Sequence, residues 1–186
     1  MTTWVDNHCH LQMSGSDADS LLHRAVAAGV EWIVCPGVDA ESSERARDLA
    51  ARHPGRILWS AGLHPHDASR WPDERDRIAD LAGEAAAVGE IGLDFYRNLS
   101  PRQPQLIAFR EQIELALELG KPAVVHTRDS FADTYEIVEA LGAGPSIVLH
   151  CWTGGRRWTK RFRELGVTFS FAGPITFAGG DTVRLA

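Results

Sequence analysis

The chain has 186 residues, of which 44% are hydrophobic and 24% charged, so it can bury the core of one globular domain. Its formal net charge of −6 argues against a protein that holds DNA through a broad basic surface, but not against an enzyme whose metal ions supply local positive charge. No apolar run approaches the roughly 18 residues of a membrane span, and the first residues have no basic leader, so we expect a cytoplasmic protein that makes no membrane contact.

Short apolar runs alternate with amphipathic segments along the whole chain. The apolar runs predict seven strands, and the 3.6-residue periodicity of the segments between them predicts six helices. The expected strands are residues 2–8, 31–37, 56–66, 85–95, 121–128, 146–152 and 167–173; the expected helices are residues 17–29, 39–55, 72–84, 101–120, 130–142 and 156–166.

Repeated strand–helix units predict an α/β fold with a parallel sheet covered by helices. Seven such strands indicate a TIM-type (β/α) barrel that is incomplete, with about seven of its eight strands present. A doubly wound open sheet is the structural alternative. Because a complete barrel typically needs about 250 residues, we expect residues 1–186 to form a single barrel domain that lacks the C-terminal strand and its helices.

Side chains able to bind metal lie at the ends of five of the predicted strands. A barrel places its functional site at the carboxyl ends of its strands, so these side chains should meet at one rim. Scattered core or surface histidines would not show this pattern. The set comprises His8 and His10 after the first strand, His64 after the third, Glu90 on the fourth, His126 on the fifth and His150 on the sixth.

The residue types suit a pair of divalent cations. Neutral imidazole binds Zn, Mn, Fe, Co or Ni, and the carboxylate of Glu90 could bridge two ions. Glu90 lies in an apolar strand, where a carboxylate is costly unless it is paired or bound to a cation. His8 and His10 should project on the same side of an extended strand, because side chains repeat every two residues. A role as hydrogen-bonded core histidines is the alternative for His126 and His150.

Four further positions have two readings each. His64 could contact substrate or a metal ligand, or it could simply lie in a turn stiffened by proline. The sequence favours no functional role for His66. Arg128 could hold a phosphate with its guanidinium group, or form an ion pair with Asp129 or Glu136. Asp94 could orient a ligand histidine or cap a loop. Trp152 could stack on a base of single-stranded nucleic acid or pack in the core.

The ordered motifs "DNHCHL", "AGLHPH", "VGEIGLDFY", "LHCWTGG" and "FSFAGPITF" run through almost the whole chain. On these motifs the chain resembles the TatD family of metal-dependent deoxyribonucleases, which have amidohydrolase-like barrels. The resemblance implies a hydrolase that cleaves phosphodiester bonds in DNA, in a single strand or from a 3′ end, with two divalent metal ions (Mg, Mn or Zn) activating a water.

The resemblance also implies roles for the clustered residues. His8, His10 and Glu90 would hold one metal, and Glu90, His126 and His150 would hold the other. Glu90 would then bridge the ions as the catalytic carboxylate. Substrate contacts would come from His64, Arg128 and Trp152, and Asp94 would support a ligand.

The chain departs from the family in one respect. The family has a further metal ligand, an aspartate at the end of an eighth strand in a motif resembling "ETDAP", and no such motif is present. Asp181 instead has the pattern of a helix N-cap. We therefore expect either a fragment of a longer product or self-association through open sheet edges.

Two alternatives to the nuclease follow from these features. One is a barrel metallohydrolase acting on an ester, lactone or amide, because a fold alone does not determine the substrate. The other is a metal-binding fragment without catalytic activity, which the missing aspartate favours.

Overall fold

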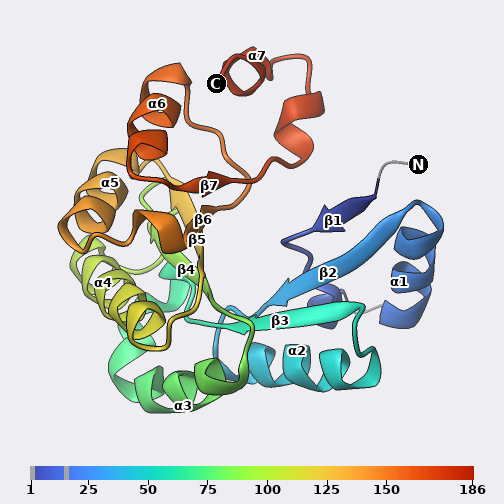
Figure 1. Ribbon diagram of the computed structural model, residues 1–186. Coiled ribbons are helices and arrows are strands. Elements are labelled where there is room, and N and C mark those ends of the chain that lie inside the picture. The colour runs from blue at the N-terminus through green and yellow to red at the C-terminus, as the bar shows by residue number, and fades with distance from the viewer. Residues whose placement is uncertain (1–2, 15–16) are drawn as a thin grey trace.

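A single parallel sheet organises the molecule in the computed structural model, which describes residues 3–14 and 17–186 (Figure 1). Its strands follow the order of the chain, so that each is hydrogen-bonded to the next. The strands are β1 (Trp4–Asp6), β2 (Val30–Pro36), β3 (Ile57–Ala61), β4 (Ala87–Asp94), β5 (Ala123–Arg128), β6 (Ile147–Leu149) and β7 (Thr168–Phe169). Thr2, where the predicted first strand began, lies outside the described residues.

Helices connect the strands and cover the outer face of the curled sheet (Figure 1). They are α1 (Ala18–Ala27), α2 (Ala40–Arg52), α3 (Trp71–Glu84), α4 (Arg102–Glu118), α5 (Phe131–Ala140), α6 (Arg156–Glu164) and the short α7 (Asp181–Arg184). Among the described residues, none of these helices is long and apolar enough to cross a membrane.

The strand order decides between the two architectures that the sequence allowed. A doubly wound sheet reverses its strand order at a switch point, whereas this sheet proceeds from β1 to β7 without reversal. The seven strands therefore form an open portion of a TIM-type barrel, with β1 and β7 as its edge strands. The prediction of an incomplete (β/α) barrel is confirmed.

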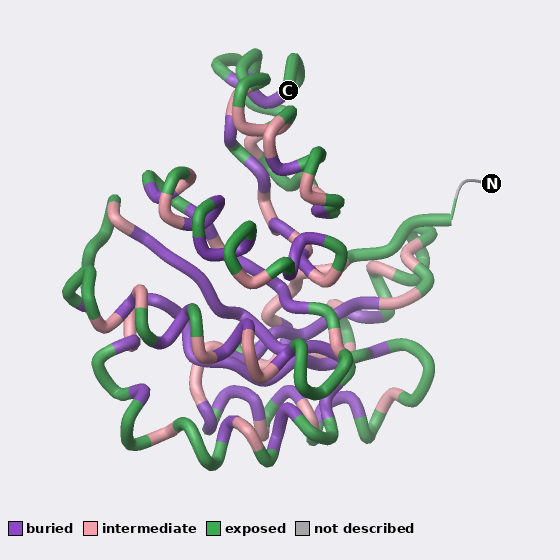
Figure 2. The backbone as a smooth tube through the Cα atoms, turned by 60° about the vertical axis from the view of Figure 1, so that its left-hand side comes forward, coloured by how far each residue is buried: buried purple, intermediate pink, exposed green. Residues whose placement is uncertain are grey.

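The core lies between the sheet and the inward faces of the helices. Every residue of β4 is buried, and α4 packs on this strand with Ala108, Phe109, Ile113 and Ala116. Figure 2 shows burial concentrated in the sheet while the outer sides of the helices stay exposed. Burial on both faces explains why the strands have continuous apolar runs in place of alternating patterns.

Strand ends differ from the prediction at five of the site residues, among them His150, which lies just after the end of β6. β1 ends at Asp6, so His8 and His10 lie in the loop that follows it, and strand alternation does not bring them together. His64 lies beyond the end of β3. Glu90 lies within β4 and not at its end, next to a shift of register between Val88 and Ile91.

Gly92 allows β4 and β5 to approach each other at the site. Its φ is +136°, and a Cβ at this position would lie 2.0 Å from the carbonyl oxygen of His126. We expect Gly92→Ala to lower the free energy of unfolding by roughly 2–4 kcal/mol, because overpacking adds to backbone strain. Urea denaturation measures this loss, with Gly83→Ala as control, since nothing lies within 4 Å of a Cβ there. Equal stabilities of the two variants would contradict the prediction.

Candidate metal centre

The carboxylate of Glu90 is the centre of a cluster of five histidines. Glu90 is 3% exposed, and its backbone N–H donates to the carbonyl of Gly37 at 2.7 Å. Each carboxylate oxygen faces a different group of imidazoles. Oε2 lies 3.1 Å from His8 Nε2 and 3.3 Å from His10 Nε2, whereas Oε1 lies 2.8 Å from His150 Nε2, 3.3 Å from His126 Nδ1 and 3.4 Å from His64 Nε2.

This division creates two sets of possible metal donors that share one carboxylate. His8, His10 and Glu90 offer ligand atoms within 4.8 Å of one another, and so do His64, Glu90 and His126. His150 stacks on His8 with ring centroids 3.7 Å apart and places Nε2 against the shared carboxylate. The six side chains line an open cavity of about 510 Å³.

Hydrogen bonds select the ring nitrogen that each histidine can offer. His10 Nδ1 lies 3.1 Å from the carbonyl oxygen of Pro36, which can only accept, so this nitrogen carries the proton. His126 Nε2 lies 3.2 Å from Asp94 Oδ2 and is protonated for the same reason. Both rings therefore direct a lone pair at the cluster, as a metal ligand requires.

His64 has the opposite tautomer. The backbone N–H of His66 donates to His64 Nδ1 at 3.2 Å, so Nδ1 carries the lone pair and Nε2 carries the proton. The protonated Nε2 faces Glu90 Oε1 at 3.4 Å. Although His64 belongs to a geometric donor set, this tautomer makes it a hydrogen-bond donor to Glu90 or to a substrate oxygen.

The donor set fits divalent cations. Two buried imidazole nitrogens make no well-oriented hydrogen bond in the described structure: His150 Nε2, although it lies 2.8 Å from Glu90 Oε1, and His8 Nδ1. The Nε2 atoms of His8 and His10 approach to 3.0 Å. A buried polar atom without a partner is costly, and coordination of a cation would satisfy His150 Nε2, because neutral imidazoles beside a carboxylate are typical ligands of transition metals.

Burial and hydrogen bonding determine the charges of the cluster. Burial raises the pKa of Glu90, but the imidazoles that face its carboxylate, among them His64 with its protonated Nε2, outweigh burial and hold the pKa well below its usual value. Burial lowers the pKa of His64, and it lowers the pKa of His150 to about 4. Near neutral pH the site therefore combines an ionised carboxylate with neutral imidazoles at His64 and His150.

The lowered pKa of His150 predicts a loss of stability in acid. An unfolded histidine binds a proton below about pH 6.5, whereas folded His150 stays neutral down to about pH 4. The unfolded chain therefore binds more protons in this window, and the free energy of unfolding of the metal-free chain decreases as the pH is lowered. From pH 7.5 to 5 we expect a loss of about 2 kcal/mol from His150 alone.

Urea denaturation in EDTA at the two pH values measures this loss. His150→Gln should lose less stability than the parent, and exposed His23→Gln should lose as much as the parent. A parent chain equally stable at both pH values would contradict the prediction.

Asp94 connects two histidines to the backbone. It is 1% exposed; Oδ1 accepts the N–H of Arg97 at 2.8 Å, and Oδ2 lies 2.9 Å from His66 Nε2 and 3.2 Å from His126 Nε2. Both readings from the sequence thus apply to Asp94, which caps a loop and contacts a candidate ligand. His66, to which sequence reasoning gave no role, lines the cavity.

Two buried glutamines, which sequence reasoning missed, hold the loops of the site. Gln105 Oε1 accepts the N–H of Asp94 at 2.9 Å, and Gln112 Oε1 accepts the N–H of Leu63 at 2.7 Å. Both side chains are 0% exposed and lie on the buried face of α4. Their spacing of seven residues within an apolar helical face is a signal that could have identified them.

Two predicted substrate contacts differ in outcome. Arg128 is exposed and forms no ion pair with Asp129 or Glu136; its guanidinium lies 3.9 Å from the centroid of the Tyr96 ring. Trp152 is 1% exposed, packs against Phe131 and donates its indole N–H to Thr159 at 2.8 Å. The prediction that Trp152 stacks on a base is therefore corrected, because its faces are covered by the core.

Asp181 does not join the cluster. It begins α7 after Gly180, which is the N-cap, and pairs with Arg184. The prediction of Asp181 as the N-cap is off by one residue. Among the described residues, Glu90 is the only carboxylate in either donor set.

A parallel barrel sheet with histidines around a buried carboxylate at its carboxyl edge is the arrangement of the amidohydrolase-like metal-dependent barrels. The family model described as TatD related DNase matches residues 5–186, and the chain therefore belongs to this family. The fold of this family implies the use of a divalent metal.

Curated relatives and solved structures agree with this assignment. The chain is 45% identical over 161 residues to the 3′-5′ ssDNA/RNA exonuclease TatD of Cronobacter sakazakii, covering 82% of this chain and 60% of that protein. It is 39% identical over 162 residues to the protein of the same name from Salmonella typhimurium, covering 84% of this chain and 62% of that protein. It thus spans about three fifths of these relatives.

The crystal structure of YJJV, a TatD homologue from Escherichia coli, matches with a TM-score of 0.79 and 26% identity, covering 94% of this chain and 70% of that chain. A TatD family hydrolase from Entamoeba histolytica matches with a TM-score of 0.83 and 21% identity, covering 91% of this chain and 64% of that chain. At 21% identity, the Entamoeba histolytica structure shows only that the fold is shared.

Proposed function

We propose that this chain carries the metal centre of a nuclease that hydrolyses phosphodiester bonds in single-stranded DNA from the 3′ end. The observation that carries the proposal is the division of the Glu90 carboxylate between two groups of imidazoles at the carboxyl edge of a barrel sheet. Relatives named as 3′-5′ ssDNA/RNA exonucleases support this choice of substrate.

Two divalent cations (Mg, Mn or Zn) are the proposed cofactors. His8, His10 and Glu90 would hold one, and Glu90, His126 and His150 would hold the other, with Glu90 shared. Bound together, such ions activate a water and stabilise the charge that develops on a phosphoryl oxygen. The lone pairs of His10 and His126 and the Nε2 of His150, which makes no well-oriented hydrogen bond in the described structure, support this assignment.

The remaining residues would position the substrate. Arg128 lines a second cavity of about 330 Å³ that shares His126 and His150 with the first. Its guanidinium is held against Tyr96 and pairs with no carboxylate in the part of the chain that the structure describes, so it can bind a phosphate. The protonated Nε2 of His64 would donate to a substrate oxygen.

The test is hydrolysis of a 3′-labelled single-stranded oligonucleotide with Mg²⁺, Mn²⁺ and Zn²⁺ in turn. Ester, lactone and amide substrates serve as comparisons, because barrels with fold-level similarity to this chain include an organophosphorus hydrolase and a β-aspartyl dipeptidase. We expect release of mononucleotides from the 3′ end. If a lactone or ester is hydrolysed while the oligonucleotide stays intact, the nuclease proposal fails and a metallohydrolase acting on esters or lactones is supported.

A metal-binding fragment without activity is the second candidate, favoured by the lack of a further carboxylate in the donor sets of the described residues. It predicts metal uptake that requires His126 and His150 without hydrolysis of any substrate. Release of mononucleotides that Glu90→Ala abolishes would exclude it.

Self-association and a cytoplasmic location are also proposals. The edge strand β1 exposes Trp4 and Val5, at 62% and 50%, and open sheet edges favour pairing with another chain. Sedimentation velocity tests the first proposal and cell fractionation tests the second; a monomer at all concentrations, or recovery outside the cytoplasm, would contradict them.

A further inference from the structure

Helix α6 concentrates positive charge in an otherwise acidic chain. Five of its nine residues are basic and one, Glu164, is acidic, while the whole chain has a net charge of −6. The basic residues are Arg156, Arg157, Lys160, Arg161 and Arg163, which we call the α6 basic face. All except the half-buried Arg161 are exposed.

The cations of this face are not neutralised by carboxylates. No ion pair within the described residues involves α6; Arg156 donates a hydrogen bond to the backbone carbonyl of Leu185 at 3.3 Å. Arginines of α2, of α3 and of the turn before α3 differ, because they pair with acids: Arg45 with Glu41, Arg47 with Asp48, Arg70 with Glu74 and Arg77 with Glu44. The contrast indicates that α6 presents its charge to a partner.

Aromatic rings hold part of the face in place. The guanidinium of Arg161 lies 3.9 Å from the centroid of the Tyr135 ring and 4.9 Å from that of Trp158, and the guanidinium of Arg157 lies 5.7 Å from Trp158. Trp158 in turn contacts Phe162, which is fully buried. A positive surface with fixed aromatic groups is typical of proteins that bind single-stranded nucleic acid.

The location of α6 connects it to the metal centre. In each strand–helix unit of this sheet the helix begins at the carboxyl edge, where the strand ends. Five residues separate His150 from Arg156, so the start of α6 lies within about 20 Å of the cluster. The cavity that contains His150 and Arg128 is also lined by Thr153, which belongs to the connection between β6 and α6.

We propose that the α6 basic face binds the phosphates of a single-stranded nucleic acid whose terminal nucleotide occupies the metal centre. This inference rests on the proposed nuclease function and adds the surface that holds the uncleaved part of the strand. A substrate of a few nucleotides would contact the metal centre alone, whereas a long strand would pass Thr153 and reach α6.

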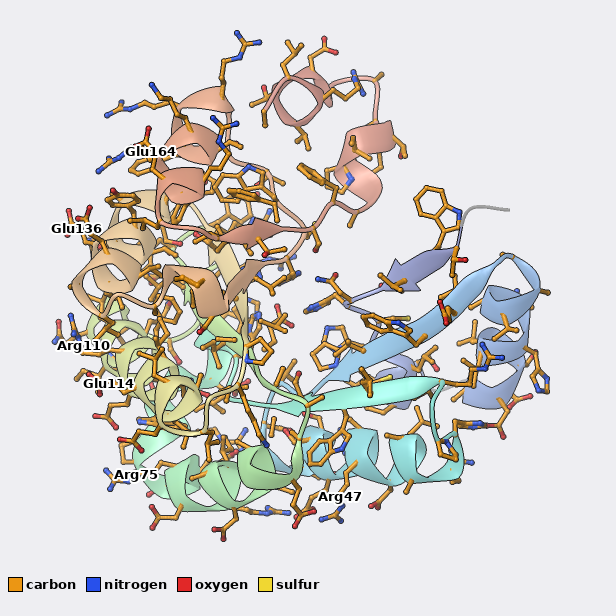
Figure 3. All side chains as sticks on the ribbon, viewed as in Figure 1. Arg47, Arg75, Arg110, Glu114, Glu136 and Glu164 are labelled. Carbon is orange, nitrogen blue, oxygen red and sulfur yellow. The ribbon has the colours of Figure 1, made fainter. Side chains whose placement is uncertain are left out.

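The test compares two variants with equal changes in charge. One carries Arg156→Gln, Arg157→Gln, Lys160→Gln and Arg163→Gln, which leaves the packed Arg161 intact. The control carries Arg24→Gln, Arg47→Gln, Arg75→Gln and Arg110→Gln, on helices α1 to α4. Figure 3 shows Arg47, Arg75 and Arg110 on helices away from α6.

Binding of a fluorescein-labelled 20-nucleotide oligo(dT) is measured by anisotropy in EDTA, over 20–200 mM salt, so that no hydrolysis occurs. Each neutralised phosphate contributes about 0.7 to the salt slope of single-strand binding, so the loss of four cations should lower the slope of the α6 variant by up to roughly 3 units. Its affinity should fall at least tenfold. At 100 mM salt and above the control should bind like the parent, because charges beyond about 10 Å are then screened.

Several results would overturn the inference. The inference fails if the parent chain does not bind the oligonucleotide, or if the two variants lose the same affinity for it, including no loss in either. It also fails if polyglutamate displaces the oligonucleotide as readily as unlabelled oligo(dT) does. In case the α6 variant does not fold, the parent is photocrosslinked to an oligonucleotide containing 4-thiothymidine. Crosslinks within 156–163 support the inference, and crosslinks confined to other segments reject it.

Hydrolysis of a dinucleotide separates this inference from the proposed function. If dT20 binding requires α6 but no phosphodiester is cleaved with any of the three metals, the docking surface is supported and the nuclease proposal fails. If the dinucleotide is cleaved and the α6 variant binds dT20 like the parent, the nuclease proposal is supported and the docking surface fails.

Discussion

Glu90→Gln should eliminate metal binding at the shared position and reduce phosphodiester hydrolysis by about 10⁴-fold or more, as expected for the removal of a central catalytic group. Glutamine has nearly the same shape as glutamate, but it removes the one negative charge that both groups of imidazoles face. Its amide also presents an N–H₂ group where the carboxylate accepted hydrogen bonds. The loss of a shared ligand would weaken both donor sets at once.

Isothermal titration with Mn²⁺ and Zn²⁺ measures the binding, and oligonucleotide hydrolysis measures the activity. Exposed Glu164→Gln is the matched control, and it should leave both unchanged. In EDTA the Glu90→Gln chain should fold but melt at a lower temperature than the parent, because it loses the interactions that hold the pKa of Glu90 below its usual value. Metal binding and hydrolysis at parental levels would reject a shared metal ligand at Glu90.

Asp94→Asn should reduce metal affinity by about 10- to 100-fold, the usual effect of removing a group that orients a ligand. The asparagine oxygen can still accept the N–H of Arg97, which places the amide N–H₂ against the protonated Nε2 of His126. Two donors cannot bond, so His126 would change tautomer and carry its proton on Nδ1. Its lone pair would then point away from Glu90.

Asp133→Asn is the control for this change, because Asp133 pairs with Arg102 away from the cluster. The tautomer of His126 is read directly from its imidazole ¹⁵N shifts, which a purely structural role of Asp94 would leave unchanged. If Asp94 acts only as a loop cap, asparagine preserves the cap, and metal affinity should equal that of the parent.

Sequence reasoning was sufficient for the order of the elements and for the residues that meet at the site. Apolar runs and helical periodicity are local properties, so all seven strands and the six main helices lie near their predicted positions. Parallel strands end at the same edge of a sheet. Residues on or just after different strands, such as His8, Glu90 and His150, could therefore be expected to meet, and in the structure they do.

Other features depend on contacts between distant segments, and only the tertiary structure decided them. The tautomers of His10 and His126 follow from Pro36 and Asp94, which approach them across the sheet. Trp152 is covered by rings from α5, α6 and β7, so its motif alone could not separate base stacking from packing. The buried Gln105 accepts the backbone N–H of Asp94, which lies eleven residues earlier in the chain.

The physical reason for this division is the range of the interactions. Periodicity and strand direction act between near neighbours, and they determined which donors reach the rim. Burial, hydrogen-bond partners and the pairing of charges depend on segments that only folding brings together. They determined the tautomers of His10 and His126, the orienting position of Asp94 and the cations of α6 that pair with no carboxylate of the described residues.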